Sequence, residues 1–315
     1  MPKISVIIAT RNRHHLLARA VKSAIEAGTD LEVVVVDDAS SPETAEVCRS
    51  LPGIKYVRAE RNLKLGGARN LGLLASSGEY ITFLDDDDVR LPGSLDVQVD
   101  KLSAKRDAGL IYGQAFHGDS ECLSTGTLYP LSCPQGDIFW ELLEWNFIPC
   151  PTTVFRRSCI YRVGLLSEDC PGIEDWDLWL RIAALYPVLS VETPVAIWRQ
   201  PTPTSDQYTS KPVEMLVLST RLFYKRWLTL PRVLQAGPKR RRELCRRFKN
   251  RVADQLMWET ARAIKDKQLR YALRTGFTML SLYPSGVFQR AARATTFRFF
   301  IKTISMGTHF PLKDA

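Results

Sequence analysis

The sequence has no long hydrophobic run: the uninterrupted apolar stretches in its 315 residues are short. A membrane-spanning helix needs about 20 consecutive apolar residues, so no such helix is predicted. The N-terminal segment MPKISVIIATRNR has no basic region, no extended apolar region and no small-residue cleavage site. We therefore do not expect a signal peptide, and we expect a cytoplasmic protein.

Closely spaced metal-ligating side chains are also missing. The seven cysteines are scattered, odd in number, and include no CxxC pair. Disulfide frameworks and structural zinc sites need paired spacing, so reduced and mainly structural thiols are predicted. The four histidines include no HExxH motif, and the neighbours His14 and His15 would project from different faces of a helix. A histidine metal site is not expected.

What the chain has is an uneven distribution of charge. Residues 1–210 carry 20 Lys and Arg against 28 Asp and Glu, whereas residues 211–315 carry 23 against 6. The last third is therefore predicted to be a separate, basic region. Such a region indicates a polyanionic partner, either nucleic acid or an anionic membrane surface.

The first hundred residues alternate between two hydrophobic periods. Continuous Ile- and Val-rich runs predict buried strands, and apolar residues spaced three and four apart predict helices between them. The predicted strands are 3–9, 32–36, 54–58 and 80–84, and the predicted helices are 14–27, 42–51 and 67–76. This order predicts an α/β fold with a mainly parallel sheet covered by helices on both faces.

Two acidic clusters follow predicted strands, Asp37 with Asp38 and the run Asp85–Asp88. Ligands bind beyond the carboxyl ends of the strands in open α/β sheets, where both clusters fall. Asp37 and Asp38 have two interpretations, as ligand-binding residues or as helix caps only. Four consecutive aspartates repel one another unless water, a cation or a basic side chain compensates them, so a cation site is predicted.

Further along, the segment GIEDWDLWLRIAALYP predicts an amphipathic helix, because Trp176, Trp179 and Leu180 share one face. Glu174 and Asp175 stand in its first turn. They are candidate functional acids, although acids there also interact well with the helix dipole. From residue 211 onward the pattern predicts helices near 213–228, 239–265, 268–282 and 287–304, separated by proline and glycine.

Five motifs in order resemble the family 2 glycosyltransferases of GT-A fold. They span residues 4–182 and read SVIIATRNR, VVVVDDAS, NLKLGGARNLG, GEYITFLDDDDVRLPGSL and EDWDLWLR. The resemblance implies a catalytic domain over 1–210, with a nucleotide-sugar half of about 1–112 and an acceptor half of about 113–210. Residues 211–315 would form a basic helical region after it.

The resemblance also implies the nucleotide-binding residues. Thr10, Arg11 and Asn12 would form the loop against the base and ribose. Asp38 would accept the N3–H of uracil, which favours a UDP- or dTDP-sugar. Arg69 would approach the nucleotide; the alternative is a helix-surface arginine paired with an aspartate.

By the same resemblance, Asp85–Asp87 stand at the DxD motif and would hold Mn²⁺ or Mg²⁺. Asp87 would be the direct metal ligand, and Asp85 is the second candidate ligand. Asp85 or Asp86 would face the ribose or the sugar, and Asp86 is assigned to nucleotide binding. Asp88 is expected to cap the helix near Pro92. Many relatives carry a YRxH-like segment where this chain has IWRQ, without the histidine, and Arg199 there is a candidate phosphate contact.

The catalytic base implied by the resemblance is Asp175, with Glu174 as the alternate. An inverting transfer needs a carboxylate that takes the proton from the acceptor hydroxyl as that hydroxyl attacks the anomeric carbon. Asp177, further along the same helix, is expected to face away. The acceptor would be a saccharide or a lipid-linked saccharide of surface polysaccharide or glycolipid assembly.

The basic region has two interpretations. Its Lys239–Arg242 run and its mixed segment 297–302 indicate peripheral attachment to an anionic membrane, on the inner face. Alternatively, it is a helical cap packed on the catalytic domain. Nucleic acid is not the expected partner, because a nucleic-acid-binding protein would leave the aspartate clusters without a role.

Two other enzyme classes are disfavoured by the segment ATRNR that follows the first strand. It contains no glycine, whereas a dinucleotide-dependent oxidoreductase would have GxGxxG there. A nucleotide-sugar pyrophosphorylase-like nucleotidyltransferase would be expected to have a Gly-rich loop with a basic residue. That nucleotidyltransferase, and a non-enzymatic polyanion-binding protein, stay as alternatives.

Overall fold

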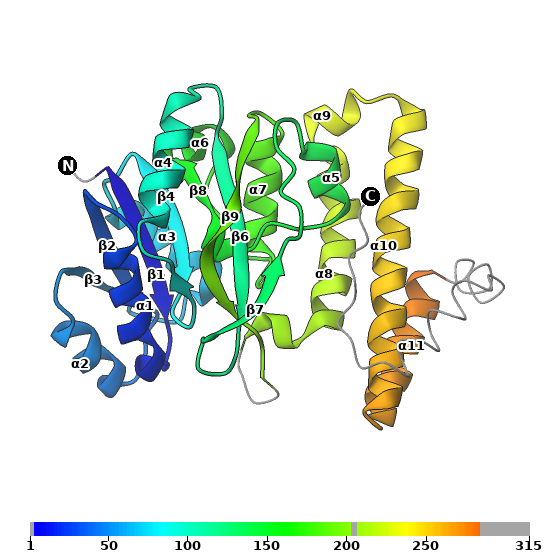
Figure 1. The fold of residues 1–315 in the computed structure, drawn as a ribbon. Helices are drawn as coiled ribbons and strands as arrows, with labels where there is room; N and C mark the ends of the chain where they lie inside the picture. The colour runs from blue at the N-terminus through cyan, green and yellow to red at the C-terminus, as the bar shows by residue number, and fades with distance from the viewer. Residues whose placement is uncertain (1–2, 203–206, 284–315) are drawn as a thin grey trace. The chain divides into compact units, whose positions relative to one another are not determined.

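The computed structural model of the protein describes residues 3–202 and 207–283 (Figure 1). The chain divides into two compact units. One comprises Met1–Leu142 and Asn146–Ser210, and the other comprises Leu143–Trp145 and Lys211–Ala315. Within the described residues, the first unit contains a nine-stranded mixed sheet.

One half of the sheet is parallel, as the sequence predicts. Its strands are β1 (Ile4–Thr10), β2 (Leu31–Asp37), β3 (Ile54–Arg58) and β4 (Tyr80–Asp85). They lie in the order β3-β2-β1-β4, with β1 between β2 and β4. β1 is buried along its whole length, which explains its continuous apolar run. Because all four strands run the same way, their carboxyl ends meet at one edge of the sheet.

Helices cover both faces of this half (Figure 1). They are α1 (His14–Glu26), α2 (Pro42–Ser50), α3 (Lys64–Ala75) and α4 (Ser94–Ala104). Leu17 and Val21 of α1 and Val99 of α4 bury their side chains in one apolar core with the sheet. α3 lies very close to β1, because a Cβ at Gly72 would overlap the Cγ2 of Ile7. Glycine at this position therefore sets how near α3 comes to the sheet.

The other half of the sheet is built from strands that the sequence did not reveal. They are β5 (Val89–Arg90), β6 (Leu110–Gly118), β7 (Ser124–Tyr129), β8 (Val154–Arg156) and β9 (Val188–Arg199). β8 runs antiparallel between β4 and β6, and β9 runs parallel to β6. The sheet order continues β4-β8-β6-β9-β5, with β7 paired to β6. This pairing brings the end of β9 to the edge where the parallel strands end.

The remaining elements of the first unit connect these strands. They are α5 (Phe139–Glu144), α6 (Arg157–Val163), α7 (Glu174–Ala183) and the 3₁₀ turns at Cys150–Thr152 and Tyr208–Ser210. α7 is the amphipathic helix predicted from the sequence. Trp179 is fully buried and packs on Phe83 of β4 and Phe155 of β8, with ring centroids 6.4 Å and 5.6 Å apart. Aromatic packing therefore fixes α7 against the sheet.

The second unit is helical in its described part. Its helices are α8 (Pro212–Lys225), α9 (Pro231–Leu234), α10 (Pro238–Lys265) and α11 (Leu269–Leu282), with a 3₁₀ turn at Trp227–Thr229. Phe223 and Phe248 stack between α8 and α10, with centroids 3.8 Å apart. The predicted helix 287–304 and the segment 297–302 lie outside the described residues.

The structure also bears on the cysteines and on membrane-spanning helices. The seven cysteines stand as free thiols, and five of them are buried. None of the described helices combines the length and apolarity needed to cross a bilayer.

Candidate active site

Four aspartates form a compact turn where β4 ends. The Asp88 amide donates to the Asp85 carbonyl oxygen at 3.0 Å, which folds the run back on itself. One carboxylate oxygen each from Asp85, Asp87 and Asp88 lies within 4.8 Å of the others. Asp86, Asp87 and Asp88 are buried, and Asp85 is partly exposed. Closely grouped carboxylate oxygens are what Mg²⁺ and Mn²⁺ prefer, so this cluster fits a divalent cation.

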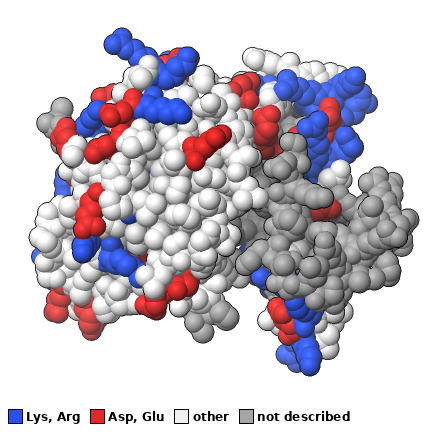
Figure 2. Space-filling view, in the orientation of Figure 1, with Lys and Arg blue, Asp and Glu red and all other residues white. Residues whose placement is uncertain are grey.

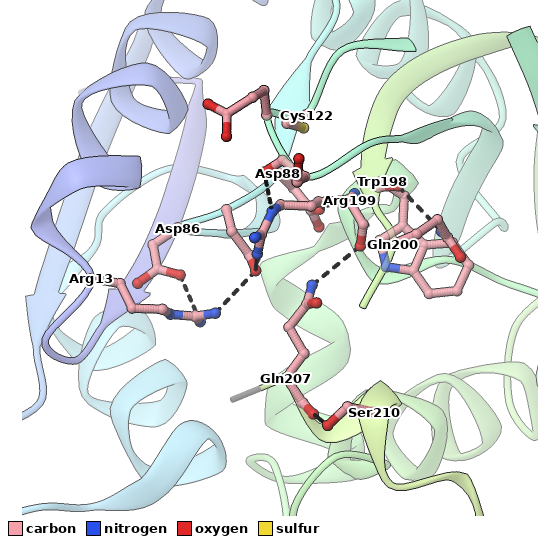
Figure 3. Close-up of polar contacts among 12 residues, drawn as sticks. Arg13, Asp86, Asp88, Cys122, Trp198, Arg199, Gln200, Gln207 and Ser210 are labelled. Carbon is pink, nitrogen blue, oxygen red and sulfur yellow. Dashed lines mark hydrogen bonds and ion pairs between the residues drawn. The ribbon is translucent and has the colours of Figure 1, made fainter. Parts of the chain in front are cut away.

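Two arginines from distant segments hold the aspartates (Figure 3). Arg13, just before α1, pairs with Asp86 at 2.6 Å and with Asp87 at 3.0 Å. Arg199, the last residue of β9, pairs with Asp87 at 3.2 Å, and its amide donates to Asp88 at 2.8 Å. The turn is therefore tied to both halves of the sheet.

The electrostatics of the cluster favour an additional positive charge. Burial raises the pKa of Asp86 to about 7, although Arg13 opposes this rise and Thr10 donates a hydrogen bond to Asp86 at 2.7 Å. Burial raises the pKa of Asp88 well above its usual value, and the neighbouring Asp87 and Asp85 raise it further. The arginines thus compensate the buried carboxylates incompletely, as is typical of a cation site.

Arg69 of α3 connects the aspartate cluster to α7. Its side chain is 3% exposed, and it pairs with Asp85 at 2.6 Å and with Glu174 at 2.9 Å. The interpretation of Arg69 as a surface residue is wrong, although the pairing with an aspartate is present. One buried guanidinium therefore joins two acidic groups that are 89 residues apart in the sequence.

The two candidate base residues of α7 have different surroundings. Glu174 is buried, and its carboxylate is committed to Arg69 and, through Oε2, to the Gly172 amide at 2.6 Å. Asp175 keeps partial exposure, and its Oδ1 accepts the Trp176 amide at 2.6 Å. Burial by the surrounding protein, followed by the charge of Glu174, raises the pKa of Asp175 to about 7. Asp175 is therefore the more available proton acceptor.

Asp177, two residues on, is buried and pairs with Arg181 at 2.9 Å. Arg181 in turn donates to the carbonyl oxygens of Val163 and Leu165, which end α6 and begin the next loop. Asp177 thus supports the packing of α7.

The nucleotide-binding candidates surround the ends of β1 and β2. Asp38 is buried, and its Oδ1 accepts the amide of Leu63, where α3 begins, at 2.6 Å. Asp37 accepts the Ser40 amide and the Tyr56 hydroxyl and also pairs with Arg58, so its role is to hold the turn. Asp37 thus has a structural role, and the ligand-binding interpretation of Asp38 stays a prediction.

The loop after β1 reaches the same turn. Asn12 has a left-handed backbone with φ of 56°, and its side-chain oxygen accepts the Ser41 amide at 2.8 Å. Arg11 is exposed, and its positive charge acts on Asp38. Thr10 is committed to Asp86, so the loop joins the Asp38 side of the site to the aspartate cluster.

The sequence analysis did not identify Arg13 and Tyr208 as residues of the site, and it gave Asp88 the wrong role. Arg13 was overlooked, although a basic residue next to the TRN segment was a signal. Tyr208 had no signal: its side chain is partly buried, and this burial, followed by the charge of Glu174, raises its pKa, although Arg11 opposes the rise. The expectation that Asp88 caps the following helix is wrong, because α4 begins at Ser94 after Gly93, and Asp88 binds the Arg199 amide instead.

A comparison with known families decides the classification. The family model described as Glycosyl transferase family 2 matches residues 5–164. The chain belongs to glycosyl transferase family 2. The match contains the β1 loop, the aspartate cluster and Arg69, and it ends before α7.

Two curated relatives illustrate the similarity of this family 2 chain to known proteins. The GalNAc(5)-diNAcBac-PP-undecaprenol beta-1,3-glucosyltransferase of Campylobacter jejuni is 45% identical over 110 residues, covering 33% of this chain and 35% of that protein. The UDP-Glc:alpha-D-GlcNAc-diphosphoundecaprenol beta-1,3-glucosyltransferase WfaP of Escherichia coli is 25% identical over 185 residues, covering 58% and 70%. The chain spans about a third of the Campylobacter protein and of several other curated relatives.

A solved structure shows the fold of this family 2 chain. The mannosyltransferase PcManGT from Pyrobaculum calidifontis, in complex with GDP-Man and Mn²⁺, superposes with a TM-score of 0.60 at 17% identity, covering 98% of this chain and 81% of that one. The GT-A fold predicted from the sequence is confirmed.

Proposed function

We propose that the protein is an inverting glycosyltransferase that moves a sugar from a UDP- or dTDP-sugar to a hydroxyl of a saccharide or lipid-linked acceptor. The assembled product would be a surface polysaccharide or glycolipid. The observation that carries this proposal is the pairing of Arg69 with both Asp85 and Glu174. This pairing connects the carboxylate cluster that fits a cation to the start of α7, where the candidate bases lie. Family membership supports the same reaction.

The chemistry of transfer assigns a role to Asp175. Its carboxylate takes the proton of the acceptor hydroxyl while that oxygen forms a bond to the anomeric carbon and the bond from this carbon to the diphosphate breaks. Glu174 keeps Arg69 in place and is a positioning residue. Residues 113–210 supply α7 and so form the acceptor half.

The donor would lie along residues 1–112. Asp38 accepts the N3–H of uracil or thymine, and Thr10, Arg11 and Asn12 line the base and ribose. The name of the Escherichia coli relative includes UDP-Glc, and both curated relatives carry undecaprenol-linked saccharides in their names. These names support a UDP-sugar donor and a lipid-linked acceptor for this chain.

The aspartate cluster fits a divalent cation, with Asp85, Asp87 and Asp88 as the residues that would hold it. The chemistry that the cation supplies when bound is stabilisation of the negative charge on the departing diphosphate. Arg13 and Arg199 keep Asp87 oriented, and Arg199 would contact phosphate as well.

The test of the donor site is calorimetric titration of the protein with UDP, dTDP, GDP and ADP, with and without Mn²⁺. We expect UDP or dTDP to bind in a metal-dependent manner. Asp87→Ala should weaken this binding about 10–100-fold or more, because it removes a cation ligand. Asp107→Asn, at an exposed carboxylate on another loop, should bind as the wild type does. Absence of binding to every pyrimidine diphosphate would contradict the proposal.

The raised pKa of Asp175 predicts the pH dependence of transfer. A base acts as the carboxylate, so activity should be present above its pKa of about 7 and fall as the pH drops below that value. We expect kcat/KM to decrease about tenfold per pH unit on the acid side. UDP binding measured over the same range separates this effect from protonation in the aspartate cluster. A flat kcat/KM profile between pH 5 and 8 would rule out Asp175 as the base.

A further inference from the structure

Helix α11 turns four large apolar side chains toward solvent. Leu269, Leu273 and Phe277 are 67%, 75% and 75% exposed, and Leu280 follows at 45%. Their spacing of four, four and three residues places them on one side of the helix. We call these four residues the apolar stripe.

The other side of α11 is already packed: small residues are buried there, and Tyr271 and Met279 are partly buried. Ala272 and Thr275 are buried, and Thr260 of α10 donates a hydrogen bond to the Thr275 hydroxyl at 2.8 Å. A surface helix usually keeps its large apolar residues inward, whereas the four residues of the apolar stripe point outward. The contact with α10 leaves the apolar stripe exposed.

Basic residues accompany the stripe. Arg270 follows a stripe residue, and Lys265 and Lys267 lie in or next to the turn between α10 and α11. Arg274 also follows a stripe residue, but it pairs with Glu214 at 2.8 Å. Residues 211–283 carry 18 Lys and Arg against 5 Asp and Glu. Figure 2 shows Lys and Arg side chains gathered at both ends of α10. An apolar surface flanked by so much positive charge is complementary to anionic lipid and not to a neutral protein surface.

We propose that α11 docks on an anionic lipid surface, with the apolar stripe in the boundary between headgroups and acyl chains. Arg270 and the lysines of the turn would contact lipid phosphates. This inference goes beyond the proposed transferase activity and does not depend on it, since it concerns a helix outside the sheet unit.

The test is flotation of the full chain with vesicles of phosphatidylglycerol and phosphatidylcholine in equal parts, compared with phosphatidylcholine alone, at about 0.15 M salt. We expect binding to the anionic vesicles only. Leu273→Ser and Phe277→Ser should each weaken it about tenfold, because each removes apolar burial. Arg270→Gln should weaken it about fivefold and reduce its salt dependence. Leu74→Ser, which changes a residue 73% exposed on α3, is the matched control and should bind normally.

Three outcomes would overturn the proposal. The wild type could fail to bind anionic vesicles. The stripe variants could bind as the wild type does. Finally, Leu273→Ser could lower the thermal unfolding temperature and leave vesicle binding unchanged. That result would show that the apolar stripe packs against protein and does not contact lipid. Duplex DNA is a useful competitor: binding to it that the stripe variants do not change would reveal a polyanion site and not a lipid surface.

Discussion

Asp175→Asn is expected to reduce kcat about 10²–10⁴-fold and to leave UDP binding within about twofold of the wild type. The substitution keeps the shape of the side chain and removes its ability to accept a proton. Because Asp175 is bonded in the structure to its neighbour's amide and not to the cation cluster, donor binding has no reason to change. Single-turnover transfer and UDP titration measure the two quantities.

The control for this variant is Asp107→Asn, the same chemical change at an exposed carboxylate. It should retain full activity. A near-normal kcat in Asp175→Asn would transfer the base role to another group. A parallel loss of UDP binding would instead indicate that Asp175 belongs to the donor site.

The second large effect is expected on stability. Arg69→Ala should lower the free energy of unfolding by about 3–5 kcal/mol, because it leaves the buried Glu174 and the partly buried Asp85 without their positive partner. Urea unfolding at neutral pH measures the change. Arg247→Ala removes an arginine that is 54% exposed and pairs with Glu243 and, at 3.4 Å, with Glu144, and it should cost about 1 kcal/mol or less.

A second substitution tests the reason for this loss. Combining Arg69→Ala with Glu174→Gln removes the more deeply buried of the two unpaired charges, so part of the lost stability should return. No recovery in the double variant would show that the cost comes from the packing of Arg69 on Phe83, where the guanidinium lies 5.2 Å from the ring centroid, and not from charge.

The parallel half of the fold was predictable because the hydrophobic patterns of neighbouring residues identify its strands and helices. Most of its strands are apolar runs next to a helix with a clear period, as in Ile4–Thr10 followed by His14–Glu26. The second half was not predictable, because β8 has three residues and β5 has two. Such short strands exist only through pairing with distant partners, and β6 and β9 pair with shifts in register.

The same distinction holds for the candidate site. The aspartate run and the acids of α7 are visible as sequence patterns, but their partners are not. Asp88 appeared to be a cap because the residue that binds it, Arg199, is 111 residues away. The choice between Glu174 and Asp175 depends on Arg69, which is 105 residues from Glu174.

The close approach of α3 to β1 has a consequence for chemistry. Gly72 lies three residues after Arg69 on the same helix, and a methyl group there would displace the helix from Ile7. Displacement of α3 would carry the guanidinium away from both of its carboxylates, and charged hydrogen bonds weaken steeply with distance. The absence of a side chain at Gly72 thus keeps the distance between the aspartate cluster and the start of α7 short enough for one arginine to bridge them.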